Sequence, residues 1–190
     1  LRLARPPGLR HGIGHDCAVL AAPTRKSDLV LKTDAVVEGV HFLRSTPAAL
    51  VGRKALARAL SDLAAAGATP RAALITAGCP DKKSAARLHS IYCGLSRAAR
   101  IWGVAIVGGE TVRTRQLLIS VSLLGTVPRG RSPHRGGARP GHLLFVTGTL
   151  GGSWPRRHLT FTPRLQEGQW LARKKIPSAM MDLSDGLGAD

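Results

Sequence analysis

The residues of this sequence best suited to chemistry are its carboxylates, because they are so few. The 190-residue chain has 11 Asp and Glu residues against 28 Lys and Arg residues. Seven of these acids lie within or beside apolar or glycine-rich stretches: Asp16, Asp34, Glu38, Asp62, Glu110, Asp182 and Asp185. Two carboxylates about 4 Å apart repel by roughly 4 kcal/mol at an effective dielectric constant of 20, so a convergent group must gain cations or protons. Mg²⁺ binds carboxylate oxygens together with substrate phosphates, so one interpretation is that these acids form a magnesium site. The alternative is that each acid separately caps a helix or forms a salt bridge.

The elements that must position these acids can be predicted from hydrophobic periodicity. The stretch LVLKTDAVVEGVHF, residues 29–42, predicts a strand that runs into a turn, with Asp34 and Glu38 near its end. Thr46 and Pro47 are typical of an N-cap and a first helical residue. Leucines then recur at spacings of four and three before Gly67, so we expect a helix with Asp62 at the edge of its apolar stripe.

Further elements follow in an order typical of an α+β fold. RAALITAGC, residues 71–79, predicts a buried strand, and Asp81 opens a second helix that Gly103 closes. Residues 104–114 and 116–127 predict two more strands, the first with Gly109 and Glu110 after its apolar start. Strand, strand, helix, strand, helix, strand, strand is an α+β succession.

The Gly/Pro/Arg-rich stretch 129–142 predicts a boundary between domains 1–128 and 129–190. We expect a short strand in HLLFVTGTLGG, residues 142–152, and a helix capped by Ser184 and Asp185. GTLGGS, residues 148–153, fits a phosphate-binding loop and a plain glycine turn about equally well.

Composition excludes several classes. No apolar run approaches the roughly 18 residues needed to cross a bilayer, so we expect a cytoplasmic chain. The formal charge of +17 raises nucleic acid as a partner, but the basic residues are scattered and carry no known nucleic-acid-binding signature.

The cysteines and two of the histidines do not form a predicted metal site. Cys17, Cys79 and Cys93 lack metal-binding spacing and are interpreted as small core residues. His11 and His15 have the i, i+4 spacing of a helical metal pair, but Gly12 and Gly14 argue against a helix there, so that site is discounted.

Six motifs occur in a fixed order over most of the chain: GIGHDCAVL, KTDAVVEGVHF, ALSDLAAAGATPRAAL, VGGETVR, HRGGARPGHLLFVTGTLGGS and MMDLSDGLGAD. Together they resemble the thiamine-monophosphate kinase family, of the superfamily that also holds aminoimidazole ribonucleotide synthetase and selenophosphate synthetase. The resemblance implies an α+β fold: an N-terminal aminoimidazole ribonucleotide synthetase-like domain that dimerises through its sheet, then the start of an α/β C-terminal domain. It also implies transfer of the γ-phosphoryl group of ATP to thiamine monophosphate, with Mg²⁺ as cofactor and a homodimer as the assembly.

The resemblance also implies roles for individual residues. The residues matching Mg²⁺ ligands are Asp16, Thr33, Asp34, Asp62, Glu110, Asp182 and Asp185. The residues matching nucleotide contacts are Tyr92, Gly109, Arg135 and Ser184. His41 matches a contact to the phosphate of thiamine monophosphate.

The chain departs from the family pattern at several points. His15 stands where the family usually has a first acid, and Glu110 stands where it usually has Asp. The segment after Ser153 is shorter than usual, and the usual second-domain contacts are absent after Asp190. We therefore expect a truncated family member. The alternatives are an inactive homologue that binds Mg-ATP without turnover, and a basic nucleic-acid-binding protein.

Overall fold

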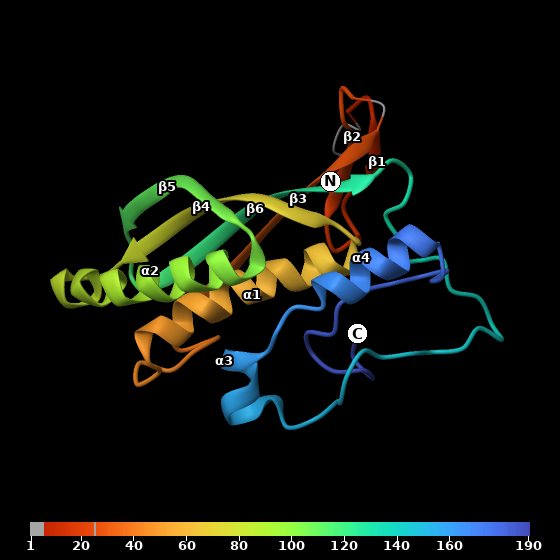
Figure 1. The fold of residues 1–190 in the computed structure, drawn as a ribbon. Coiled ribbons are helices and arrows are strands. Elements are labelled where there is room, and N and C mark those ends of the chain that lie inside the picture. The colour runs from red at the N-terminus through yellow and green to blue at the C-terminus, as the bar shows by residue number, and fades with distance from the viewer. Residues whose placement is uncertain (1–5, 25) are drawn as a thin grey trace.

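The computed structural model describes residues 6–24 and 26–190, which form a mixed six-stranded sheet covered on one face by helices (Figure 1). The strands are β1 (Leu9–His11), β2 (Ala18–Ala21), β3 (Ser27–Val37), β4 (Thr69–Cys79), β5 (Ala105–Arg113) and β6 (Leu118–Pro128). The helices are α1 (Ala48–Ala65), α2 (Lys82–Trp102), the short η1 (Ser153–Arg157) and α3 (His158–Thr160), and α4 (Leu165–Lys174). The strand order is β1-β2-β3-β6-β4-β5; among these described strands β4 and β5 pair in parallel and the other neighbours pair antiparallel. The expected α+β class is confirmed.

The two faces of the sheet differ because residues alternate along each strand. On β3, Val30 and Val36 are buried against the helices, whereas Leu31 and Thr33 on the other face are exposed. The register pairs Leu31 with Leu124 of β6 and Thr33 with Ser122. Lys32 and Asp34 therefore share the helix-covered face.

Helices α1 and α2 lie against each other through two glycines. A Cβ on Gly52 of α1 would stand 2.1 Å from the carbonyl oxygen of Ile91, and one on Gly94 of α2 would stand 2.0 Å from that of Ala49. Any larger residue would force the helices apart, so these glycines set the close packing that fixes α1 against the sheet.

The ends of the two long helices test the capping predictions. Asp81 caps α2, its carboxylate accepting a hydrogen bond from the Ser84 amide at 2.7 Å, and Gly103 closes the helix in a left-handed conformation, both as predicted. On α1 the prediction was wrong by one residue, because Pro47 occupies the N-cap position. The hydroxyl of Thr46 instead accepts a hydrogen bond from the Leu43 amide at 3.0 Å, which stabilises the preceding turn.

The connection after β6 differs from the sequence prediction. Residues 129–152 form no helix or strand in the described chain, so the strand expected over 142–152 is wrong. Leu143, Leu144 and Phe145 are largely exposed, because no neighbouring strand pairs with this apolar run. GTLGGS bends with Gly148, Gly151 and Gly152 at positive φ, a backbone that suits both a glycine turn and a phosphate-binding loop, so its role stays a prediction.

The C-terminal residues return to α1. Helix α4 packs on α1, where a Cβ on Gly168 would stand 2.1 Å from the carbonyl oxygen of Ala64 (Figure 1). Residues Ser184 and Asp185 are not helical in the described chain, and the Asp190 carboxylate accepts hydrogen bonds from their backbone N–H groups. The domain boundary at residue 129 stays a prediction.

Two smaller findings complete the fold. Cys17 belongs to the core and Cys79 packs against it, but Cys93 is exposed on the outer side of α2, so its core assignment was wrong. Within the described residues, no helix has the length and apolar character needed to span a membrane.

Candidate active site

Three of the predicted metal ligands converge from distant parts of the chain. Asp16 lies in the glycine loop between β1 and β2, Asp62 lies on α1, and Asp182 lies in the C-terminal segment. One carboxylate oxygen from each lies within 4.8 Å of the other two. We call these three residues the acidic triad.

Local structure explains how each triad residue reaches the others. The buried side chain of Cys17 anchors the glycine loop in the core, beside Asp16. Asp62 is buried at the edge of the apolar stripe of α1, as the sequence predicted. The hydroxyl of Ser184 donates to Asp182 at 3.2 Å and so orients the third carboxylate.

Two cations flank the acidic triad. Lys32 of β3 donates from its ammonium group to Asp62 at 2.7 Å, and the Arg135 guanidinium lies 3.5 Å from Asp16. Burial alone would lower the pKa of Lys32, but the hydrogen bond and charge of Asp62 raise it above the usual value. Lys32 therefore stays charged and offsets part of the repulsion among the carboxylates.

The acidic triad retains excess negative charge despite these cations. Burial, followed by the charge of Asp182, raises the pKa of Asp62 to about 7, against the opposing effect of Lys32. Burial and Asp182 also raise the pKa of Asp16, against the opposing effect of Arg135. Raised carboxylate pKa values mean that the site stabilises an added proton or cation. The donor set, three carboxylates without a neutral nitrogen or sulfur ligand, fits a hard divalent cation.

A second group of polar residues surrounds Asp34 on the same helix-covered face. Arg58 of α1 lies 3.2 Å from Asp34, and the pKa of His41 is lowered by burial and by the charges of Arg58 and Lys54. Lys54 donates to the His41 carbonyl oxygen and lies 2.7 Å from Nδ1 of His158. Burial, together with Arg58, lowers the pKa of Lys54 to about 8. We call Lys54, Arg58 and His41 the basic group.

Two predicted metal ligands lie on the opposite face of the sheet. The Thr33 hydroxyl contacts those of Ser122, at 3.1 Å, and Ser120 on the open face. Glu110 is exposed and stands in register with Thr76, which pairs in turn with Ser120. The structure therefore separates Thr33 and Glu110 from the acidic triad, and their roles as ligands stay predictions.

The remaining predicted residues are dispersed. Gly109 lies in β5 with φ +153°, and a Cβ there would stand 1.8 Å from the Ile75 carbonyl oxygen, so packing alone requires glycine. Tyr92 lies on α2 and packs against the core. Arg135 and Ser184 contact the acidic triad, whereas Asp185 is exposed on the adjoining turn. These nucleotide and metal roles also stay predictions.

Sequence reasoning missed Lys32, Arg58 and Lys54. The strand period contained a signal for Lys32, since it stands two residues before Asp34 and must share its face. Arg58 and Lys54 lie four and eight residues before Asp62 on α1, so helical spacing places them along the same side. Glu38, by contrast, pairs with Arg87 at 3.6 Å, the salt-bridge alternative considered for each acid.

The fold and the acidic triad define an α+β protein with a candidate cation site beneath its sheet. Residues 14–127 match the family model described as AIR synthase related protein, N-terminal domain, and the chain belongs to this family.

Within this family, the chain is similar in sequence to thiamine-monophosphate kinases. The chain is 36% identical to the thiamine-monophosphate kinase of Escherichia coli (strain K12) over 200 residues, covering 94% of this chain and 60% of that relative. It is 38% identical to the thiamine-monophosphate kinase of Rhodopirellula baltica, covering all of this chain and 62% of that relative. The chain thus spans about 60% of the length of these curated relatives.

The chain is also similar in structure to solved thiamine-monophosphate kinases. The structure described as AaThiL complexed with AMPPCP and TMP matches with a TM-score of 0.83 at 34% identity, covering 94% of this chain and 62% of that one. The thiamine-monophosphate kinase of Aquifex aeolicus matches with a TM-score of 0.80 at 34% identity, covering 90% and 63%.

Proposed function

We propose that this chain provides the metal and nucleotide site of a thiamine-monophosphate kinase, which transfers the γ-phosphoryl group of ATP to thiamine monophosphate and yields thiamine diphosphate. The observation that carries the proposal is the convergence of Asp16, Asp62 and Asp182 from three segments. The likeness to thiamine-monophosphate kinases supports the choice of reaction. ATP is abundant in the cytoplasm, where we place this activity.

The residues present suit phosphoryl transfer between two polyanions. The acceptor phosphate is already anionic, so the protein mainly has to align two phosphates and offset their repulsion. Asp16, Asp62 and Asp182 would hold Mg²⁺, which supplies charge neutralisation at the phosphate oxygens. Arg135, beside Asp16 and 41% exposed, is free to turn toward a nucleotide phosphate.

The basic group supports a place for the acceptor phosphate. Arg58 and Lys54 bring two cationic side chains to the end of β3, next to His41. A phosphate there would gain charge-assisted hydrogen bonds from Arg58 and, because its negative charge favours protonation, from Lys54. We therefore assign the acceptor to the basic group and the nucleotide to the acidic triad.

The decisive experiment follows thiamine diphosphate by chromatography after mixing the chain with ATP, thiamine monophosphate and Mg²⁺. We expect Asp62→Asn to abolish Mg²⁺-dependent nucleotide binding and product formation. Asp81→Asn is the matched control, because Asp81 is also an Asp at a helix but only caps α2. Equal effects of the two changes on binding would refute the site.

Binding and turnover must be measured separately. Calorimetric titration with Mg-ATP measures binding, and product formation measures transfer. Nucleotide binding that depends on Asp62 without any product would favour the inactive homologue. Absence of both, with retained fold, would refute the proposed function of this chain.

We also propose that the chain forms a homodimer through the open face of its sheet. The helices cover one face only, and Leu31, Leu74 and Leu124 expose 43%, 51% and 36% of their surface on the other (Figure 1). A second copy would bury this apolar patch. Leu74→Arg should yield a monomer by light scattering, whereas Ile101→Arg, at an exposed end of α2, should not; a dimer that survives Leu74→Arg would refute this interface.

A further inference from the structure

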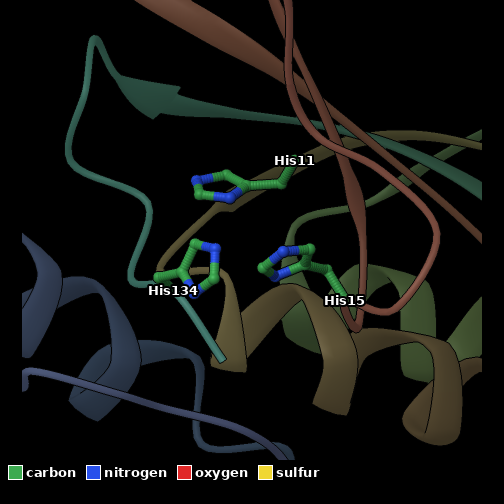
Figure 2. Close-up of side chains that lie close together, drawn as sticks. All are labelled: His11, His15 and His134. Atoms are coloured by element: carbon green, nitrogen blue, oxygen red, sulfur yellow. The ribbon is translucent and has the colours of Figure 1, made fainter. Parts of the chain in front are cut away.

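Three histidines, two of them neighbours in sequence and the third 119 residues further on, surround one point beside the glycine loop. His11 ends β1, His15 lies in the loop before β2, and His134 lies in the connection after β6. Their ring centroids are 4.7 Å apart for His11 and His15, 5.2 Å for His11 and His134, and 4.3 Å for His15 and His134. Figure 2 shows the three rings turned toward one another, His11 and His15 from β1 and the loop after it and His134 from the connection after β6. We call these residues the histidine triad.

The nitrogen atoms of the histidine triad are close enough to share one ion. One ring nitrogen from each residue lies within 4.8 Å of the other two. Tetrahedral coordination with Zn–N bonds of about 2.0–2.1 Å needs nitrogens about 3.3 Å apart. Each pair therefore has to close by at most about 1.5 Å, which small side-chain rotations provide.

One further observation points to a ligand site rather than ring packing alone. Nδ1 of His11 is buried and has no hydrogen-bond partner among the described residues, a costly state for a polar atom. Nδ1 of His134 accepts a hydrogen bond from the Gly136 amide at 2.9 Å, and zinc binding at that nitrogen would replace this bond.

We propose that His11, His15 and His134 form a zinc site that is distinct from the acidic triad. Three neutral imidazoles suit Zn²⁺, with a fourth position left for water, whereas Mg²⁺ prefers oxygen ligands. Bound zinc would tie the connection after β6 to β1 and the glycine loop, and so fix Asp16, the neighbour of His15, within the acidic triad. The proposal concerns the histidine triad alone and holds whether or not the chain is a kinase.

The test titrates Zn²⁺ into metal-stripped protein, purified without a histidine tag, against a chromophoric chelator. Excess Mg²⁺ is present throughout, so that the acidic triad does not compete for zinc. We expect one Zn²⁺ per chain and at least about tenfold weaker binding in His15→Asn and in His134→Asn. His89→Ala is the matched control, because His89 lies outside the histidine triad on α2, where its ring lies 3.9 Å from the sulfur of Cys93 and could bind zinc in its own right.

Two outcomes would overturn the zinc site. Unchanged affinity in both triad variants would do so, as would loss of binding in His89→Ala or Asp62→Asn. X-ray absorption at the zinc edge of the unaltered chain gives an answer that does not depend on any variant folding. Three imidazole nitrogens in the first shell support the site, and a shell of oxygen or sulfur alone overturns it.

Discussion

Replacing Lys32 with methionine tests whether a metal ion and this lysine serve the same carboxylates. The Lys32 ammonium lies 2.7 Å from the Asp62 carboxylate, and their side chains are 22% and 9% exposed. Removing one partner of a buried pair costs about 3–5 kcal/mol, and water at Lys32 reduces this to about 2–3 kcal/mol. Methionine keeps the packing of the aliphatic stem, so the loss reports mainly on the charge.

The expected result depends on the cation present. With EDTA at about pH 8, Lys32→Met should lower the free energy of unfolding by about 2–3 kcal/mol, because the acidic triad loses its closest positive charge. In millimolar Mg²⁺ the loss should fall below about 1 kcal/mol, since a bound cation replaces the ammonium. Urea unfolding followed by circular dichroism measures both values, with the exposed Lys26→Met as control. The same loss in EDTA and in Mg²⁺ would show that the lysine and the metal do not share a site, and the reasoning would fail.

Three other predictions follow from the site and the fold. The pKa of Asp62 is raised to about 7 in the folded chain, above its unfolded value, so Asp62 stabilises the fold at low pH and this contribution is lost as pH rises through about 7. Thermal unfolding in EDTA should show the melting temperature falling over this pH range, and Asp62→Asn should make it depend less on pH. Because Glu110 lies on the face of the sheet opposite the acidic triad, Glu110→Gln should change the affinity for Mg-ATP by no more than about twofold in a titration, whereas Asp16→Asn should lower it about tenfold or more. A large loss of affinity in Glu110→Gln would show that Glu110 does contribute to the metal site. Gly94→Ala should lower the free energy of unfolding by about 2 kcal/mol or more, measured in urea, although alanine has the better helix propensity, while Ser90→Ala at an exposed position of the same helix should be nearly neutral. Equal urea midpoints for the two variants would mean that α1 and α2 can move apart at little cost.

The sequence could predict which elements form, because periodicity and caps are local properties. The long strands and both long helices lie where alternation and leucine spacing placed them, and Asp62 lies at the edge of the α1 stripe. The sheet face of each ligand was harder to predict. Thr33 and Asp34 were grouped by the resemblance as ligands, but adjacent residues of a strand point to opposite faces. The strand period therefore places Thr33 and Asp34 on different faces of the sheet, and their roles as ligands stay predictions.

The histidine triad shows a second limit of sequence analysis, namely that local spacing does not predict contacts between distant segments. The i, i+4 spacing of His11 and His15 was discounted because glycines prevent a helix, and that part of the reasoning holds, since His15 lies in a loop. The loop nevertheless turns back so that the two rings meet, and the third imidazole comes from 119 positions beyond His15. No local pattern encodes such a contact, because it depends on how the connection after β6 brings His134 to the end of β1.

The acidic triad couples cation binding to the position of the C-terminal segment. Asp182 is the one carboxylate of the three that comes from beyond residue 128, and it lies within 4.8 Å of Asp16 and Asp62. At that distance each pair of charges repels by roughly 3 kcal/mol at an effective dielectric constant of 20, which favours release of the segment when no cation is bound. A divalent ion reverses the sign of this contribution, because all three carboxylates are then drawn to one centre. If an ion binds there, its affinity and the stability of the docked segment must rise and fall together by linkage, so the ion proposed to meet the nucleotide phosphates would also hold the segment beside them.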